Sequence, residues 1–204
     1  MALDPKSTAV LILDLQNDVI GPEGAFKDSG SPAHAESQNV VANVQRLAAA
    51  ARKAGAAVIH VHHFASVGAA HDADSAQNAG LWTGTRAVDA MKRGSWGAQP
   101  VAGLEPQDGD VVIEKQRVSA FFGTPLDVKL RGLGVSTVIV TGAWTNMSVE
   151  STIRYGADLG YEMVLVSDGT STVSAEWQKA ATDYAVTNLA EVKTTDELVS
   201  ELGG

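Results

Sequence analysis

The chain has 204 residues, of which 45% are hydrophobic and 19% are charged, so it can bury a sizeable core as one domain spanning residues 1–204. Its net charge of -9 argues against a nucleic acid or an anionic membrane as partner, because phosphate binding needs clustered Lys and Arg. The absence of cysteine excludes disulfides and thiolate metal sites.

Targeting segments are not expected either. No apolar run reaches the roughly 18 residues that a membrane span needs. The N-terminal stretch "MALDPKSTAVLILDLQND" lacks the basic flank and the cleavage site of a signal peptide. We therefore expect a cytoplasmic protein whose partner is a small molecule.

Six short apolar runs predict β-strands, and helical patterns lie between most of them. The runs cover residues 9–13, 57–61, 110–114, 137–141, 162–166 and 190–193. The helical patterns cover about residues 38–54, 125–133, 146–159 and 175–189. This alternation predicts an α/β fold: a three-layer, Rossmann-like open sheet of six mostly parallel strands with helices on both faces. The nearly continuous hydrophobicity of the runs predicts that the strands are buried on both faces.

Residues 64–109 contain no clear strand and are rich in Gly, Ala, Asp and His. A segment of this length is too long for a plain connection in a compact domain. Such segments usually form or cover a binding site. We therefore expect substrate specificity to lie chiefly in this region.

Three polar residues follow the ends of three different predicted strands. Asp14 follows the first strand, Lys115 follows the strand at 110–114, and Ser148 lies six residues after Gly142. Ligands of open parallel sheets bind outside the carboxyl ends of the strands, so the three side chains should converge. Each also has a simpler explanation, since charged residues often solvate loops and Ser is common at helix N-termini.

The three motifs together resemble the isochorismatase-like, or cysteine hydrolase, superfamily. The resemblance covers nearly the whole chain. It rests on "AVLILDLQND", on "WGAQPVAGLEPQDGDVVIEKQRVSAFFGTPLDVKLRGLGVSTVIVTG" and on "TNMSVESTIRYGADLGYEMVLVSDGTST". It implies that Asp14 is a general base, that Lys115 stabilises charge, and that position 148 carries the nucleophile. It also implies a homo-oligomer, either a homodimer or a homotetramer, and favours the branch of ureidoacrylate, biuret and N-carbamoylsarcosine amidohydrolases.

Position 148 departs from the family, because most members have cysteine where this chain has Ser148. A thiol becomes a thiolate readily beside a lysine and a helix N-terminus, whereas an alcohol needs a base during attack. Ser148 therefore predicts reduced activity. Either a natural variant or an engineered Cys-to-Ser replacement explains it, and the closeness of "TNMSVEST" to the cysteine motif favours the replacement.

The resemblance also assigns the residues around the nucleophile. The backbone N–H groups of Trp144 and Ser148 would form an oxyanion hole, since a helix N-terminus offers unpaired donors. The Ala143–Trp144 peptide bond should be cis. We expect Ser148 Oγ to lie within about one hydrogen bond, or one water, of Asp14 or Lys115.

Several residues are candidates for substrate binding, although each would also suit loop or core packing. Gln99 and Asn146 could hydrogen-bond an amide, and His63 could line the pocket. Apolar walls are expected from Trp96, Phe121, Phe122 and Trp144.

No catalytic metal or other cofactor is expected. Nicotinamidases in the superfamily hold a divalent ion with an Asp-x-His pair, but the matching region here reads "HVHHFA". His60 and His62 alternate on one strand face, where histidines are more often structural than ligands.

Three functions remain open at this point. The first is hydrolysis of the C–N bond of a small amide or ureide through an acyl-enzyme. The second is vinyl-ether hydrolysis of the isochorismatase type, in which Asp14 is the acid and no thiol is needed. The third is a catalytically silent protein that binds a small molecule.

Overall fold

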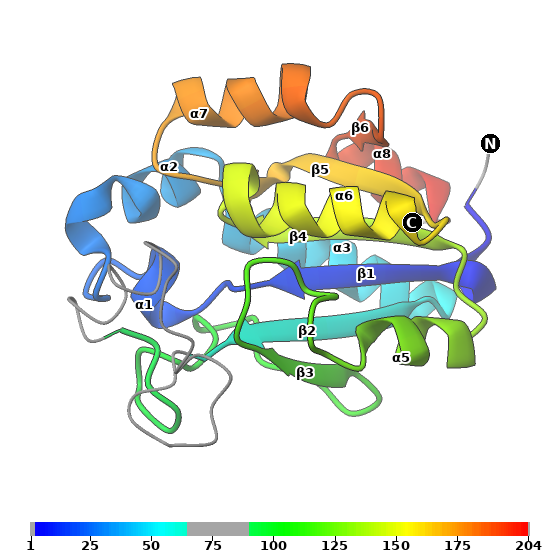
Figure 1. Cartoon of the computed structure of the whole chain (residues 1–204), viewed down its shortest axis with the longest axis horizontal. Coiled ribbons are helices and arrows are strands. Elements are labelled where there is room, and N and C mark those ends of the chain that lie inside the picture. The colour runs from blue at the N-terminus through cyan, green and yellow to red at the C-terminus, as the bar shows by residue number, and fades with distance from the viewer. Residues whose placement is uncertain (1–2, 65–89, 204) are drawn as a thin grey trace.

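The computed structural model describes residues 3–64 and 90–203, and a parallel sheet lies at its centre (Figure 1). Its strands are β1 (Thr8–Leu13), β2 (Ala57–His63), β3 (Val111–Lys115), β4 (Thr137–Ala143), β5 (Glu162–Ser171) and β6 (Ala190–Lys193). The strand order is β3-β2-β1-β4-β5-β6, and every neighbouring pair is parallel. The predicted six-stranded α/β sheet is therefore confirmed.

Helices cover both faces of the sheet, as predicted. Figure 1 shows α6 passing in front of the strands and α3 behind them. The larger helices are α2 (Ser31–Ser37), α3 (Val40–Ala54), α5 (Leu126–Gly132), α6 (Glu150–Asp158), α7 (Ala175–Ala180) and α8 (Thr195–Glu201). Shorter elements are η1 (Pro5–Ser7), α1 (Asn17–Ile20), η2 (Lys27–Ser29), η4 (Thr145–Val149) and η5 (Ala181–Ala185).

Two hydrophobic cores result, one on each face of the sheet. Successive side chains of a strand point to opposite faces, so Val10 of β1 packs with α3 and α8 whereas Leu11 packs with α5 and α6. All six residues of β1 are buried. Full burial of the central strand fixes the position of the residue that follows it, Asp14.

The edge strands differ from the prediction of burial on both faces. In β3, exposed and buried residues alternate towards its end, and Val112 is 51% exposed. In β6, every residue is exposed or partly buried. These strands lie at the two edges of the sheet, where part of each face is left open to solvent. Continuous hydrophobicity in the sequence therefore did not distinguish central from edge strands.

The helix boundaries also differ in places. The pattern at 146–159 is divided into the π-helical turn η4 and α6, and the pattern at 175–189 ends with η5 at Ala185. The short helices α1 and α2 and the C-terminal α8 were not predicted. Of the expected specificity segment, residues 65–89 lie outside the described residues.

The strand order places a topological switch point between β1 and β4. From β1 the chain proceeds to β2 and β3 on one side and to β4, β5 and β6 on the other. Connections that diverge in this way leave a crevice beyond the carboxyl ends of the two strands. Within residues 3–64 and 90–203, no helix is long and apolar enough to span a bilayer.

Candidate active site

The acid and the lysine form a buried ion pair across the end of β2. Asp14 follows β1 directly and has a positive φ of 54°, which Asp tolerates better than most residues. Lys115 is the last residue of β3, and its Nζ lies 2.8 Å from Asp14 Oδ2. The exposed fractions of the two residues are 5% and 3%, so the pair is shielded from water.

All three N–H donors of the Lys115 ammonium have acceptors in the protein. Besides Asp14, Lys115 Nζ donates to the carbonyl oxygens of Arg117 at 3.1 Å and Val118 at 3.0 Å. An ammonium has three N–H donors, so all three are occupied. Lys115 therefore holds the Asp14 carboxylate in one orientation and leaves Oδ1 for other contacts.

A tight turn at the end of β4 positions the Ser148 hydroxyl. Gly142 has a φ of 120°, and a Cβ placed there would lie 2.0 Å from the backbone oxygen of Leu13. Only glycine lets the end of β4 approach β1 this closely. One residue further on, the Ala143–Trp144 peptide bond is cis as expected. The chain then enters η4, which contains the buried Ser148.

Asp14, Lys115 and Ser148 line one pocket of about 70 Å³. The other lining residues among the described part of the chain are Val19, Phe26, His63, Met91, Val118, Ala143, Trp144 and Met147. Asp14 Oδ1 and Ser148 Oγ are both buried, and neither has a hydrogen-bond partner among the described residues. Two polar atoms thus lie buried around one small apolar space.

We expected Ser148 Oγ to lie within one hydrogen bond, or one water, of Asp14 or Lys115. Within the described residues, Ser148 Oγ forms no direct hydrogen bond to either side chain. In a free enzyme, catalytic hydrogen bonds are often long and shorten only with substrate bound. The arrangement therefore leaves Ser148 Oγ and Asp14 Oδ1 available to the same ligand. The convergence at one sheet edge agrees with the expectation from the strand ends.

Trp144 forms a fixed wall of the pocket. Its indole Nε1 donates to Ser31 Oγ at 2.6 Å, and that hydroxyl in turn donates to the carbonyl oxygen of Val19 at 2.7 Å. The ring of Phe26 meets the indole edge-on, with 5.5 Å between centroids. Contacts from both α1 and α2 therefore hold the indole in place.

His63 lies in the pocket lining, as expected, and its imidazole is neutral at neutral pH. Burial is the main cause that lowers the pKa of His63 well below its usual 6.5, and the positive charges of Lys115 and Arg117 lower it further. An imidazole in this state contributes polarity without positive charge.

Five of the expected substrate-binding residues lie outside the described lining of the pocket. Trp96 and Phe122 are 53% and 55% exposed, and Gln99 is also exposed. Within the described part of the chain, none of the three belongs to the pocket lining. Asn146 Oδ1 accepts a hydrogen bond of 2.5 Å from Thr172 Oγ1, so this amide ties η4 to the end of β5.

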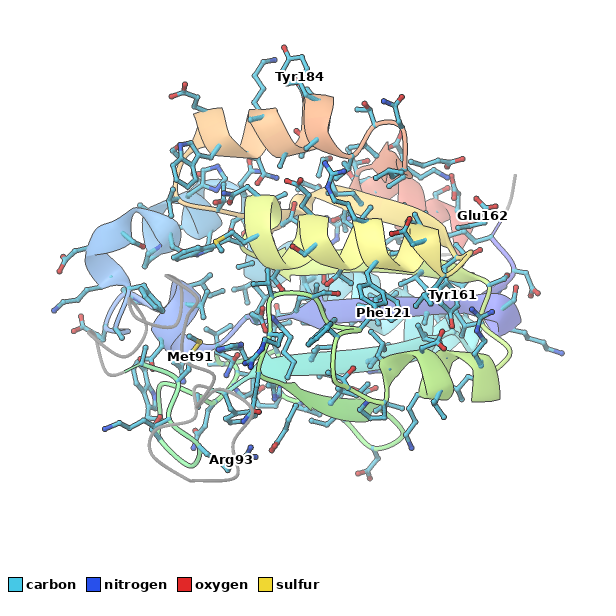
Figure 2. All side chains as sticks on the ribbon, viewed as in Figure 1. Met91, Arg93, Phe121, Tyr161, Glu162 and Tyr184 are labelled. Carbon is cyan, nitrogen blue, oxygen red and sulfur yellow. The ribbon has the colours of Figure 1, made fainter. Side chains whose placement is uncertain are left out.

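Phe121 is a core residue and not a pocket wall. It is buried among the residues beneath α6, where its ring stacks on Tyr155 at 5.7 Å and on Tyr161 at 5.9 Å. Figure 2 shows Phe121 and Tyr161 together at the sheet, well away from Met91. The expectation that Phe121 forms an apolar wall of the pocket is therefore not met among the described residues.

Gln16 is a structural residue of the site that the sequence reasoning did not single out. It is fully buried, and its Nε2 donates to the carbonyl oxygens of His63 at 2.9 Å and Ala98 at 2.7 Å. Its Oε1 accepts from the His63 N–H at 2.8 Å. The side chain therefore extends the pairing of β1 and β2 beyond the last strand residue.

Asp18 performs a similar task at the next turn. Its carboxylate accepts from the backbone N–H groups of Ala25 at 3.0 Å and Met91 at 2.6 Å. Gly97 packs against this carboxylate so closely that a Cβ there would lie 2.1 Å from Oδ2. The signal in the sequence was polar residues within an apolar motif, "LDLQND", directly after a buried strand.

His60 and His62 do not belong to the pocket lining. His60 Nε2 lies 3.1 Å from Asp110 Oδ2, and Arg52 of α3 binds the same carboxylate at 2.7 Å. Across residues 3–64 and 90–203, no three His, Asp or Glu side chains form a group that could hold a metal ion. His60 therefore links β2 to Asp110, which directly precedes β3, and through that carboxylate to Arg52 of α3.

A parallel α/β sheet with a pocket at its switch point defines a class of proteins that bind small molecules at the strand ends. Within this class the chain belongs to the isochorismatase family, since the Isochorismatase domain model matches residues 8–197. The resemblance noted from the motifs is thus confirmed.

Relatives of known name or structure are similar over nearly the whole chain. The ureidoacrylate amidohydrolase RutB of Variovorax paradoxus (strain S110) is 31% identical over 98% of this chain and 82% of its own length. A cysteine hydrolase structure from Pseudomonas syringae pv. phaseolicola 1448A covers all of this chain and 95% of its own, with 27% identity and a TM-score of 0.84.

The N-carbamoylsarcosine amidase of Thermoplasma acidophilum has the same fold. Its structure covers 93% of this chain and 96% of its own, with 24% identity and a TM-score of 0.72. At this identity the likeness concerns the fold alone.

Proposed function

We propose that this protein hydrolyses the C–N bond of a small amide or ureide. The observation that carries the proposal is that the buried Asp14–Lys115 pair and the buried Ser148 hydroxyl line the same pocket. The family relation to a protein named ureidoacrylate amidohydrolase supports the choice of an amide bond over an ester or an ether.

In this mechanism Ser148 Oγ attacks the carbonyl carbon, and its proton passes to Asp14 Oδ1. The backbone N–H groups of Trp144 and Ser148 stabilise the oxyanion that forms. The C–N bond then breaks as Asp14 returns the proton to the leaving nitrogen, which departs as ammonia or an amine. An ester between the substrate acyl group and Ser148 remains.

Water completes the reaction. Asp14 Oδ1 accepts a proton from the attacking water, the second tetrahedral intermediate collapses, and Ser148 Oγ recovers its proton as the acid product leaves. Throughout, Lys115 stays bound to Asp14 Oδ2 and balances the buried negative charge. Each proton transfer thus uses the carboxylate oxygen that has no partner among the described residues.

The serine makes this a slow enzyme. A cysteine thiol begins at a pKa of about 8.5 and ionises near a lysine, whereas the serine hydroxyl must lose its proton during the attack itself. We therefore propose that the chain is a Cys-to-Ser form with reduced turnover.

The experiment is ammonia release from a panel of simple amides and ureides, measured for this chain and for Ser148→Cys. Turnover that is slow with the first protein and fast with the second supports the proposal. Hydrolysis of a vinyl ether but no amide by both proteins would instead identify the ether hydrolase. A ligand that raises the Tm of both, without turnover of any compound, would identify a binding protein.

We also propose that residues 1–204 fold as one domain and assemble as a homodimer or homotetramer, as the family resemblance implies. Light scattering of the purified chain tests the assembly. A monomeric mass at concentrations where the protein is active would contradict it.

A further inference from the structure

The described lining of the pocket offers no unused positive charge. Its polar members are Asp14, His63, Lys115 and Ser148, and its remaining members are apolar. The three donors of the Lys115 ammonium already bind Asp14, the Arg117 carbonyl and the Val118 carbonyl. His63 is neutral because burial lowers its pKa.

Asp14 makes the binding of a second negative charge in the pocket unfavourable. Its Oδ1 is buried and has no hydrogen-bond partner among the described residues. A substrate carboxylate in the same small space would lose its hydration and face this oxygen without a counter-ion. Burying an unpaired charge is costly, so an anionic substrate is disfavoured relative to a neutral one.

The two arginines nearest to this region already have protein acceptors. Arg117 lies outside the pocket lining within the described chain, and its Nη1 donates to the carbonyl oxygen of Gln116 at 3.0 Å. Arg93 is bound to Glu114 at the surface. Figure 2 shows Arg93 at the lower edge of the molecule, beyond Met91.

The apolar wall gives a neutral substituent a preformed surface. Trp144 is held by the Ser31 hydroxyl and by the edge of Phe26, and Met91 is held through its backbone N–H by Asp18. A ligand that packs against Trp144 does not need to order the indole first, which favours affinity. Met147 adds a flexible apolar side chain next to the nucleophile.

We infer that the substrate of this protein is an uncharged small amide whose acyl substituent is apolar, and that amides bearing a carboxylate are rejected. The inference rests on the proposed amide hydrolysis for its chemistry but concerns the recognition of the substituent. It sets this chain apart from its relative named for ureidoacrylate, because that name denotes an acid.

The test uses two amides of similar shape, 4-methylpentanamide and succinamate, in which an isopropyl group replaces a carboxylate. We expect kcat/KM of the Ser148→Cys protein to be at least about tenfold higher for the neutral amide, since an unpaired buried charge costs more than about 1.4 kcal/mol. Equal rates, or a preference for succinamate, would overturn the inference.

Calorimetric binding to Ser148→Ala separates this inference from the proposed function. If Ser148→Cys hydrolyses neither amide, the hydrolase proposal fails, yet tighter binding of 4-methylpentanamide than of succinamate still supports the neutral pocket. Binding of succinamate alone, or of neither amide, contradicts it.

A charge placed in the wall provides a second readout. In the Ser148→Cys background, Met147→Lys should shift the kcat/KM ratio about tenfold or more towards succinamate, whereas Met147→Gln, of similar length and uncharged, should not. Because the ratio compares two substrates of one enzyme, altered reactivity of the nucleophile cancels. A shift of the same size with Met147→Gln, or no shift with Met147→Lys, would count against the inference.

Discussion

At the scale of single residues, the buried Asp14–Lys115 pair determines both stability and reactivity. Each partner compensates for the desolvation of the other, so removing one leaves an uncompensated charge in the interior. We expect Lys115→Met to lower the free energy of unfolding by about 3 kcal/mol. Urea unfolding followed by tryptophan fluorescence measures this loss.

The double variant Lys115→Met/Asp14→Asn is the control for this explanation. It removes the unpaired buried carboxylate, so it should be more stable than Lys115→Met alone. The stability losses of Lys115→Met and Asp14→Asn should therefore not be additive. Additive losses would mean that the pair contributes no coupling and that Lys115 acts through packing only.

Gln16 provides a second prediction for a residue, because its amide satisfies three backbone groups at His63 and Ala98. Gln16→Leu leaves these buried groups without partners, which should cost about 2 kcal/mol or more. The matched control is Gln45→Leu, because Gln45 is exposed and donates one hydrogen bond, to the Gly103 carbonyl. Chemical unfolding should separate the two variants clearly, and equal stability losses would contradict the role of Gln16.

At the scale of elements, the approach of β4 to β1 depends on one glycine. A Cβ at Gly142 would overlap the backbone oxygen of Leu13, and its φ of 120° is unfavourable for other residues. Gly142→Ala should therefore destabilise the protein by about 3 kcal/mol or more. Gly132→Ala in α5, where no atom lies within 4 Å of the added Cβ, should be neutral or slightly stabilising. Thermal unfolding of the two variants gives the comparison, and similar Tm values would refute it.

Much of this framework was predictable from the sequence, because strands with nearly continuous apolar residues have few alternatives. All six strands were placed within about two residues at their starts, and the end of β1 identified Asp14. Other features were not predictable in the same way. β5 extends to Ser171, well past the apolar run, because Thr170 and Ser171 pair with the end of β4 after a shift in register.

The unpredicted helices have local causes that hydrophobic periodicity does not report. In α8, Thr194 and Glu197 form a capping box, with Glu197 Oε2 accepting from the Thr194 N–H at 2.7 Å. This pattern was readable in "TTDE". The pocket walls were harder to predict, since Phe26 and Met91 reach the site only through the hydrogen bonds of the Gln16–Asp18 turn.

At the scale of the whole molecule, buried histidines make stability depend on pH. Burial is the main cause that lowers the pKa of His34, His60, His62 and His63 below 6.5. Below that pH the unfolded chain therefore binds more protons than the native one, and stability falls as the pH falls.

Urea unfolding at about pH 7 and about pH 5.5 should thus show a lower free energy of unfolding at the lower pH. Titration of Asp110 does not contribute to this change in stability between about pH 7 and about pH 5.5. Its burial acts to raise its pKa, but bonds to Arg52 outweigh that effect and leave it below 3.8, so its contribution is lost only in stronger acid. In His34→Gln the pH dependence should be shallower, and stability that is constant or higher at about pH 5.5 would contradict the sign.

The central claim is that Asp14, Lys115 and Ser148, brought together only by the sheet, act as one catalytic unit. Its most direct test is kcat/KM for amide hydrolysis by Ser148→Cys with and without Asp14→Asn. We predict that Ser148→Cys raises the rate by about two orders of magnitude or more, and that Asp14→Asn abolishes this gain because the thiol then lacks its proton acceptor. A cysteine variant whose rate is indifferent to Asp14→Asn would contradict the account.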